Sequence, residues 1–172
     1  MNNQTLDYSK QKKGKKILIS EEQDGMIIWL GNNDVIRKSA GQVFYNHSDA
    51  QVESVAVLPQ IALPGSKLMM ELYAFDVTLK KWGDKIASIE KLVQHGDCEE
   101  WLFFSFENQN LKPGQWYGFK LICNEGQVAV AEGMHKQTDI ITKSMQWTAA
   151  HGHDAGHFHN DFHLAYMVAL AA

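Results

Sequence analysis

The segment Trp101-Leu-Phe-Phe-Ser-Phe106, followed after a turn by Gln115-Trp-Tyr-Gly-Phe-Lys-Leu-Ile-Cys123, decides the fold class. In both segments the strongly apolar residues fall on alternate positions, which is the period of an extended strand. Placing both apolar sets on one side predicts an antiparallel hairpin in which Phe103 covers Gly118. The alternative is that the two strands lie in opposite sheets of a sandwich, where they would not pair.

The rest of the chain follows the same plan, because short apolar runs alternate with turn-forming residues. We expect strands near residues 16–20, 26–30, 42–46, 52–58, 67–75, 86–92, 101–106, 115–123, 127–131, 145–148 and 162–170. A short helix over 82–92 is an alternative for that segment. The prediction is an all-β fold: a two-sheet β-sandwich with jelly-roll-like topology. It would occupy residues 25–172 as one domain, preceded by a polar, flexible leader at residues 1–24.

Composition narrows the function classes. The 172 residues carry 16 basic and 20 acidic side chains, a formal charge of −4, so the chain lacks the basic excess that a nucleic-acid backbone demands. The one basic run, Lys10 to Lys16, lies in the leader, where we expect a solvated terminus or a weak contact with an anion. No segment has the ~18 consecutive apolar residues of a membrane span.

The beginning of the chain has no apolar signal segment, which predicts a cytoplasmic location. An extracellular or virion-associated location would require a removed signal or another export route. Only two cysteines, Cys98 and Cys123, are present. The predicted hairpin would bring them face to face, but two buried free thiols are the main expectation, since cytosolic proteins seldom keep disulfides.

A wider pattern adds a family resemblance. Its strands read Gly41-Gln-Val-Phe44, Val52-Glu-Ser-Val-Ala-Val57 and Leu68-Met-Met-Glu-Leu-Tyr73, and the pattern continues through 101–106 and 111–119 to Phe162-His-Leu-Ala-Tyr-Met-Val168. Over about residues 41–170 it resembles the jelly-roll accessory modules of bacterial surface proteins and phage tail proteins, labelled choice-of-anchor domains. These are similar in plan to carbohydrate-binding modules. The resemblance implies a non-catalytic binding or structural module and supplies no site residues.

A histidine-rich segment near the end of the chain suggests a metal site. Imidazole is a common ligand of transition metals, and alternate residues of a strand share one face. A His-x-His pair on a strand suits zinc, nickel or copper. The candidate ligands are His151, His153, His157, His159, Asp161 and His163. The alternatives are a polar loop with solvated histidines and adventitious metal binding.

Aromatic residues suggest a second kind of site, because exposed tryptophan and tyrosine rings can stack on the apolar faces of sugars. The candidates for such a binding face are Trp101, Phe103, Trp116 and Trp82. The alternative for each is a role in packing the core or the sheet, as for most tryptophans.

The sequence contains no enzyme signature: the nucleophile elbow, the His-Glu-x-x-His zinc motif and the phosphate-binding glycine loop are all missing. A glycosidase pair or a structural calcium could use scattered carboxylates such as Asp97 and Glu99, but no ligand set stands out. The leading hypothesis is therefore a non-catalytic binding module for carbohydrate or another surface ligand. The alternatives are a structural subunit of a phage or surface assembly and a metal-binding protein.

Overall fold

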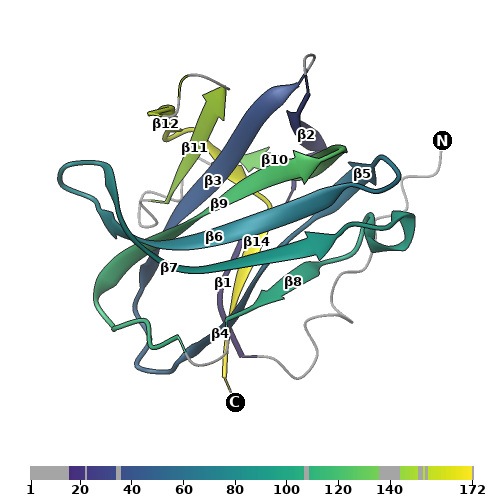
Figure 1. Cartoon of the computed structure of the whole chain (residues 1–172). Helices are drawn as coiled ribbons and strands as arrows, with labels where there is room; N and C mark the ends of the chain where they lie inside the picture. The colour runs from purple at the N-terminus through teal and green to yellow at the C-terminus, as the bar shows by residue number, and fades with distance from the viewer. Residues whose placement is uncertain are drawn as a thin grey trace.

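The computed structural model describes residues 16–21, 23–33, 36–106, 109–135, 144–150, 153 and 155–171. Two β-sheets pack against each other (Figure 1), which confirms the expected all-β sandwich. Within these residues the helical structure is limited to one short 3₁₀ turn, η2 (His95–Asp97).

The smaller sheet has the strand order β1-β14-β4-β8, with every neighbouring pair antiparallel. Its strands are β1 (Lys16–Glu21), β14 (Tyr166–Leu170), β4 (Val52–Val57) and β8 (Leu102–Ser105). Because β1 pairs with β14, residues 16–21, which the prediction placed in the leader, form part of the smaller sheet.

The larger sheet has the strand order β13-β10-β2-β3-β9-β6-β7, with three short strands added beside it. Its main strands are β13 (Phe162–Leu164), β10 (Gln127–Met134), β2 (Met26–Asn32), β3 (Arg37–Asn46), β9 (Gln115–Glu125), β6 (Lys67–Asp76) and β7 (Lys81–Leu92). The additions are β11 (Met145–Ala150), paired with β3, β12 (His157–His159), paired with β11, and β5 (Pro59–Ala62), paired with β10.

Strand β9 organises this sheet, because it pairs with β3 on one side and with β6 on the other. Its odd-numbered residues from Tyr117 to Cys123 face the core between the sheets. There the Phe119 ring lies 5.8 Å from the ring of Tyr166 in β14, on the opposite sheet. The even-numbered residues of β9 face outward and carry the features described below.

The predicted hairpin is wrong. Strand β8 pairs with β4 in the smaller sheet, whereas β9 lies in the larger one. Phe104 of the smaller sheet and Phe119 of the larger sheet are both fully buried in the same core cluster. Alternation gives the same sequence pattern for strands that pair and for strands that face each other across a core, so the pattern alone did not decide between them.

The structure bears on three further expectations. Residues 162–170 do not form one strand, because β13 joins the larger sheet and β14 the smaller one. Residues 81–92 form the strand β7 and no helix. Both cysteines are free, as expected, although Cys98 is only half-buried. Burial raises the pKa of Cys123 to about 11, so this thiol is unreactive at neutral pH.

Gly118 is covered by Trp82, not by Phe103. A Cβ atom at position 118 would lie 2.7 Å from Trp82 Cζ3 and 2.8 Å from the Gln42 carbonyl oxygen. We expect Gly118→Ala to lower the free energy of unfolding by about 1–3 kcal/mol, because the backbone oxygen cannot move aside. Urea unfolding measures this loss.

Gly96→Ala is the matched control, since a Cβ atom there has no atom within 4 Å. Its free energy of unfolding should stay within about 1 kcal/mol of the parent value. Equal losses of unfolding free energy in the two variants would show that the crowding around Gly118 does not affect stability.

Candidate functional site

The described part of the structure has a hollow of about 820 Å³ where β6 ends, β7 begins and β9 begins. This volume lies in the range typical of small-molecule sites. The walls come from three segments: the end of β6 with the turn after it, the first half of β7, and the loop that leads into β9. The lining residues are Ala74, Phe75, Asp76, Val77, Gly83, Asp84, Ile86, Asn110, Leu111, Lys112, Gln115, Trp116 and Tyr117.

The loop wall is held from below by a buried amide. Asn46, at the end of β3, is fully buried and donates from Nδ2 to the carbonyl oxygens of Leu111 and Lys112, at 3.0 and 3.3 Å. Its own carbonyl accepts from the backbone N–H of Gly114 at 2.7 Å. The hydroxyl of Tyr117 accepts a further bond from the backbone N–H of Lys112 at 2.8 Å. These bonds hold residues 111–114 of the loop against β3 and β9 without any contribution from a ligand.

The opposite wall is also fixed. Asp76 Oδ1 accepts hydrogen bonds from the backbone N–H groups of Thr78 and Leu79, both at 2.9 Å. This pattern closes the turn between β6 and β7. The turn ends at Lys80, whose φ of 50° lies in the left-handed region. One carboxylate thus both shapes the turn and lines the hollow.

Between these walls stand one aromatic surface and several polar groups. Trp116 is half-buried, and its ring centroid lies 5.3 Å from that of Tyr45, which is 40% exposed. The side chains of Asp84, Asn110 and Gln115 are exposed and make no hydrogen bond to any other described residue. The hollow therefore offers a flat apolar surface beside unused hydrogen-bond donors and acceptors.

A second feature lies farther along the outer face of the same sheet. The Lys120 ammonium sits over three aromatic rings at 4.9, 4.9 and 4.7 Å from the centroids of Tyr73, Trp82 and Trp147. Cation–π attraction of this kind is favourable within about 6 Å. We call this group the aromatic cage. Because Lys120 already fills it, the cage ties β9 to β6, β7 and β11.

A carboxylate on β6 completes the cage. Glu71 accepts hydrogen bonds from Lys85 Nζ at 2.6 Å and from the Tyr73 hydroxyl at 2.5 Å. Burial by itself would raise the pKa of Glu71, but the hydrogen bonds from Lys85 and Tyr73 and the charges of Lys85 and Lys120 outweigh it and hold the pKa below its usual value. Burial and the same hydrogen bond raise the pKa of Tyr73, so its hydroxyl keeps its proton.

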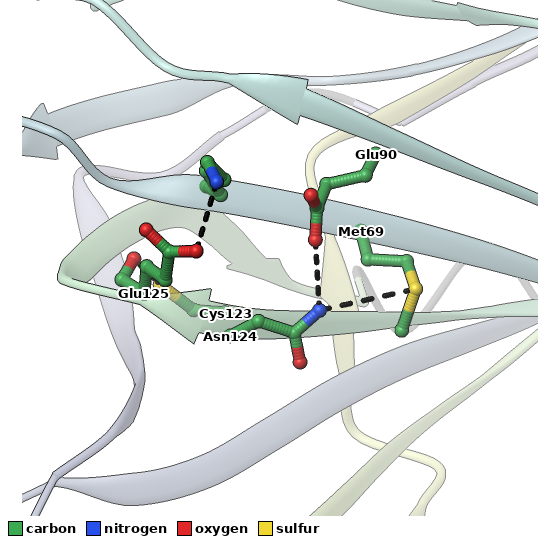
Figure 2. Close-up of polar contacts among 6 residues, drawn as sticks. Met69, Glu90, Cys123, Asn124 and Glu125 are labelled. Carbon is green, nitrogen blue, oxygen red and sulfur yellow. Dashed lines mark hydrogen bonds and ion pairs between the residues drawn. The ribbon is translucent and has the colours of Figure 1, made fainter.

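The far end of these strands carries a separate set of polar contacts, shown in Figure 2. Lys67 Nζ lies 2.8 Å from Glu125 Oε1, and Asn124 Nδ2 donates to Glu90 Oε2 at 2.9 Å. These contacts join β6 and β7 to β9 at the end away from the hollow. The lysine is exposed, so we assign these contacts a role in positioning the strands.

The four predicted aromatics do not form one face. Trp101 is 5% exposed and packs, with the half-buried Phe103, in a cluster around Ala56 and Met167 of the smaller sheet. Trp82 and Trp116 belong to the larger sheet. Trp82 is occupied in the aromatic cage, and only Trp116 lines the hollow.

The predicted metal ligands are also separated. His151 lies outside the described residues, and His153 and His157 are exposed. His159 Nε2 lies 2.9 Å from Thr148 Oγ1. His163 is buried, and its Nδ1 lies 3.0 Å from the carbonyl oxygen of Leu164.

The reason is a bend at Asn160 and Asp161, which ends β12 and starts β13. The two strands pair with different partners, β11 and β10, so their histidines do not share the single strand face that the sequence suggested. Among the residues that the structure describes, no group of three or more His, Cys, Asp or Glu side chains is placed to hold a metal ion.

No protein-family model matches this chain, and no curated protein is significantly similar to it. No helix in the described part is long and apolar enough to cross a membrane.

Sequence reasoning missed most of the hollow. Asp76, Asp84, Asn110 and Gln115 come from three separate segments, and none stands in a motif. The one available signal was the turn at 112–114 directly before Trp116, which placed an aromatic residue at a strand entrance.

The depressed pKa of Glu71 predicts a pH dependence. Its contribution to stability is fully present above the unfolded-state pKa of about 4.3 and is lost as the pH falls through the lower folded-state value. We expect Glu71→Gln to be roughly 2 kcal/mol less stable than the parent at pH 7. This difference should shrink as the pH falls from 5 toward 3, as measured by urea unfolding at each pH.

Glu90→Gln serves as the control, because Glu90 is an exposed carboxylate on the neighbouring strand. Its stability should differ much less from the parent at pH 7. A constant gap between Glu71→Gln and the parent from pH 7 to pH 3 would contradict the assigned role of the Glu71 charge.

Proposed function

We propose that this chain is a non-catalytic, jelly-roll-type binding module for carbohydrate, with the hollow beside Trp116 as its binding site. The observation that carries the proposal is the combination of a half-buried indole with the unused polar side chains of Asp84, Asn110 and Gln115 in one preformed hollow. A sugar ring has an apolar face, which an indole can cover, and a rim of hydroxyl groups, which amides and carboxylates can bind.

Rigidity supports the same proposal. The bonds of Asn46 and Tyr117 to the loop wall and of Asp76 to the turn wall are all internal to the protein. A preformed site loses little conformational entropy on binding, which matters for a ligand whose hydroxyl groups must first give up water. Tyr45, beside Trp116, would extend the aromatic surface toward a second sugar unit.

The charged side chains that line the hollow indicate which class of carbohydrate should bind there. Asp76 and Asp84 line it together with one cation, Lys112. An excess of carboxylate disfavours uronic, sialic and sulfated sugars through like-charge repulsion. We therefore expect neutral oligosaccharides to bind in preference to acidic ones of the same length.

The test is a binding screen with neutral hexasaccharides of glucose, mannose, xylose and N-acetylglucosamine, followed by calorimetry on any that bind. Trp116→Ala should weaken binding at least tenfold, equivalent to about 1.4 kcal/mol, while the melting temperature changes little. Gln115→Ala should weaken binding less, because it removes one polar contact and leaves the aromatic surface.

Trp29→Ala is the matched control: Trp29 is half-buried on β2 of the same sheet and does not line the hollow. It should bind as the parent does. The proposal is wrong if no neutral saccharide binds, or if Trp29→Ala and Trp116→Ala weaken binding equally.

A further inference from the structure

Strand β7 forms one edge of the larger sheet, and within the described residues it pairs only with β6. It has twelve residues, which is long for an edge strand. An open edge of this length is a template for another strand, and proteins leave such edges short or shielded unless they are used. Figure 1 shows β7 at the front of the sandwich, above β8.

The charges along β7 are self-complementary. When one β7 is laid antiparallel to a second copy about a two-fold axis at Ser88, and Ile86 is left out of the count as a bulge, Lys85 comes opposite Glu90 and Asp84 comes opposite Lys91. Because the two-fold axis relates the two copies, each of these two pairs occurs twice in the dimer. Opposite charges at facing positions stabilise paired strands, and like charges there would destabilise them.

The side-chain faces match in the same register. The pairing with β6 shifts by one residue between Ala87 and Lys85, which leaves Ile86 as a bulge, and shifts again between Lys85 and Trp82, so that Gly83 and Asp84 share one position. Ile86, Ala87 and Ile89 all pack toward the core. In the two-fold register Ala87 faces Ile89 of the second copy, and the bulge then lets Lys85 face Glu90. A bulge in an edge strand commonly discourages pairing with another strand. Here the bulge keeps side chains of the same sheet face opposite each other in the two copies.

We propose that two copies of this chain pair antiparallel through β7, joining their larger sheets into one. The Asp84–Lys91 contact carries the register, because Lys85 and Glu90 already bond to Glu71 and Asn124 within each copy, whereas Lys91 has only a cation–π contact, 5.8 Å from its Nζ to the Phe104 ring centroid. Asp84 is exposed and has no partner among the described residues, and Leu92, at the end of the strand, is 50% exposed.

This pairing also bears on the hollow, since Gly83 and Asp84 line it. In the proposed register Lys91 of the second copy would stand at its rim. That last consequence rests on the proposed function, whereas the pairing itself does not.

Charge exchange tests the pairing. Analytical ultracentrifugation of the full chain should show a dimer, and Asp84→Lys should weaken its association at least tenfold, since it places two lysines opposite each other. The exchanged double variant Asp84→Lys with Lys91→Asp should restore association to within about threefold of the parent. A monomeric parent at high concentration, or a double variant as weak as Asp84→Lys alone, would overturn the proposal.

A crosslink gives a readout that is independent of charge. Facing Cα atoms of antiparallel strands lie within disulfide reach. In a Cys98→Ser background, oxidised Ser88→Cys should form a covalent dimer, because the two-fold axis passes at Ser88. Glu90→Cys, whose facing residue is Lys85, should not. Equal crosslinking of the two variants would indicate random collision and contradict the register.

These outcomes are distinguishable from failure of the carbohydrate proposal. A dimer that binds no saccharide would keep the β7 pairing and remove the function of the hollow. A monomeric parent that binds a saccharide and loses this binding in Trp116→Ala would support the function of the hollow and exclude the β7 pairing.

Discussion

The strict alternation of side chains along β9 is the constraint on which the rest of the structure depends. Its odd-numbered residues build the core against the smaller sheet, and its even-numbered residues build the outer face. Trp116 and Lys120 are even-numbered, so one opens toward the hollow and the other fills the aromatic cage. A shift of one residue in register would exchange the two faces and remove the core and both outer features together.

Small residues make this arrangement possible at two points. Gly41 and Gly118 lie on β3 and β9 where neighbouring atoms leave no room for a Cβ atom. At Gly118 the space is taken by the Trp82 ring, which brings Trp82 within reach of Lys120 and Trp147. The cage and the hollow are therefore parts of one packed outer face of the larger sheet. The aromatic side chains of the cage cover the centre of this face, and the hollow lies at its uncovered end.

The sequence predicted the strands and the sandwich better than it predicted their partners. Alternation identified β8 and β9 as strands, but Phe104 and Phe119 lie in opposite sheets of one core, and sequence spacing does not distinguish that arrangement from a hairpin. Of the four aromatic residues that the sequence suggested, only Trp116 lines the hollow, and it directly follows the turn at residues 112–114. Trp101 carries the same chemistry and is buried, since its place is decided by packing against Ala56 and Met167, far away in the sequence. The histidine segment failed as a single strand because the bend at residue 160 sends its two halves to different partners.

The central claim is that a neutral saccharide occupies the hollow and touches Trp116. The most direct measurement is a ¹⁵N-correlated NMR titration of the full chain with the best-binding neutral hexasaccharide, following the five indole N–H signals assigned by single Trp→Phe variants. The account predicts that the Trp116 signal and the backbone signals of residues 110–116 shift together and saturate, while the Trp29 and Trp101 signals stay in place. Saturating shifts confined to another face of the molecule would contradict it.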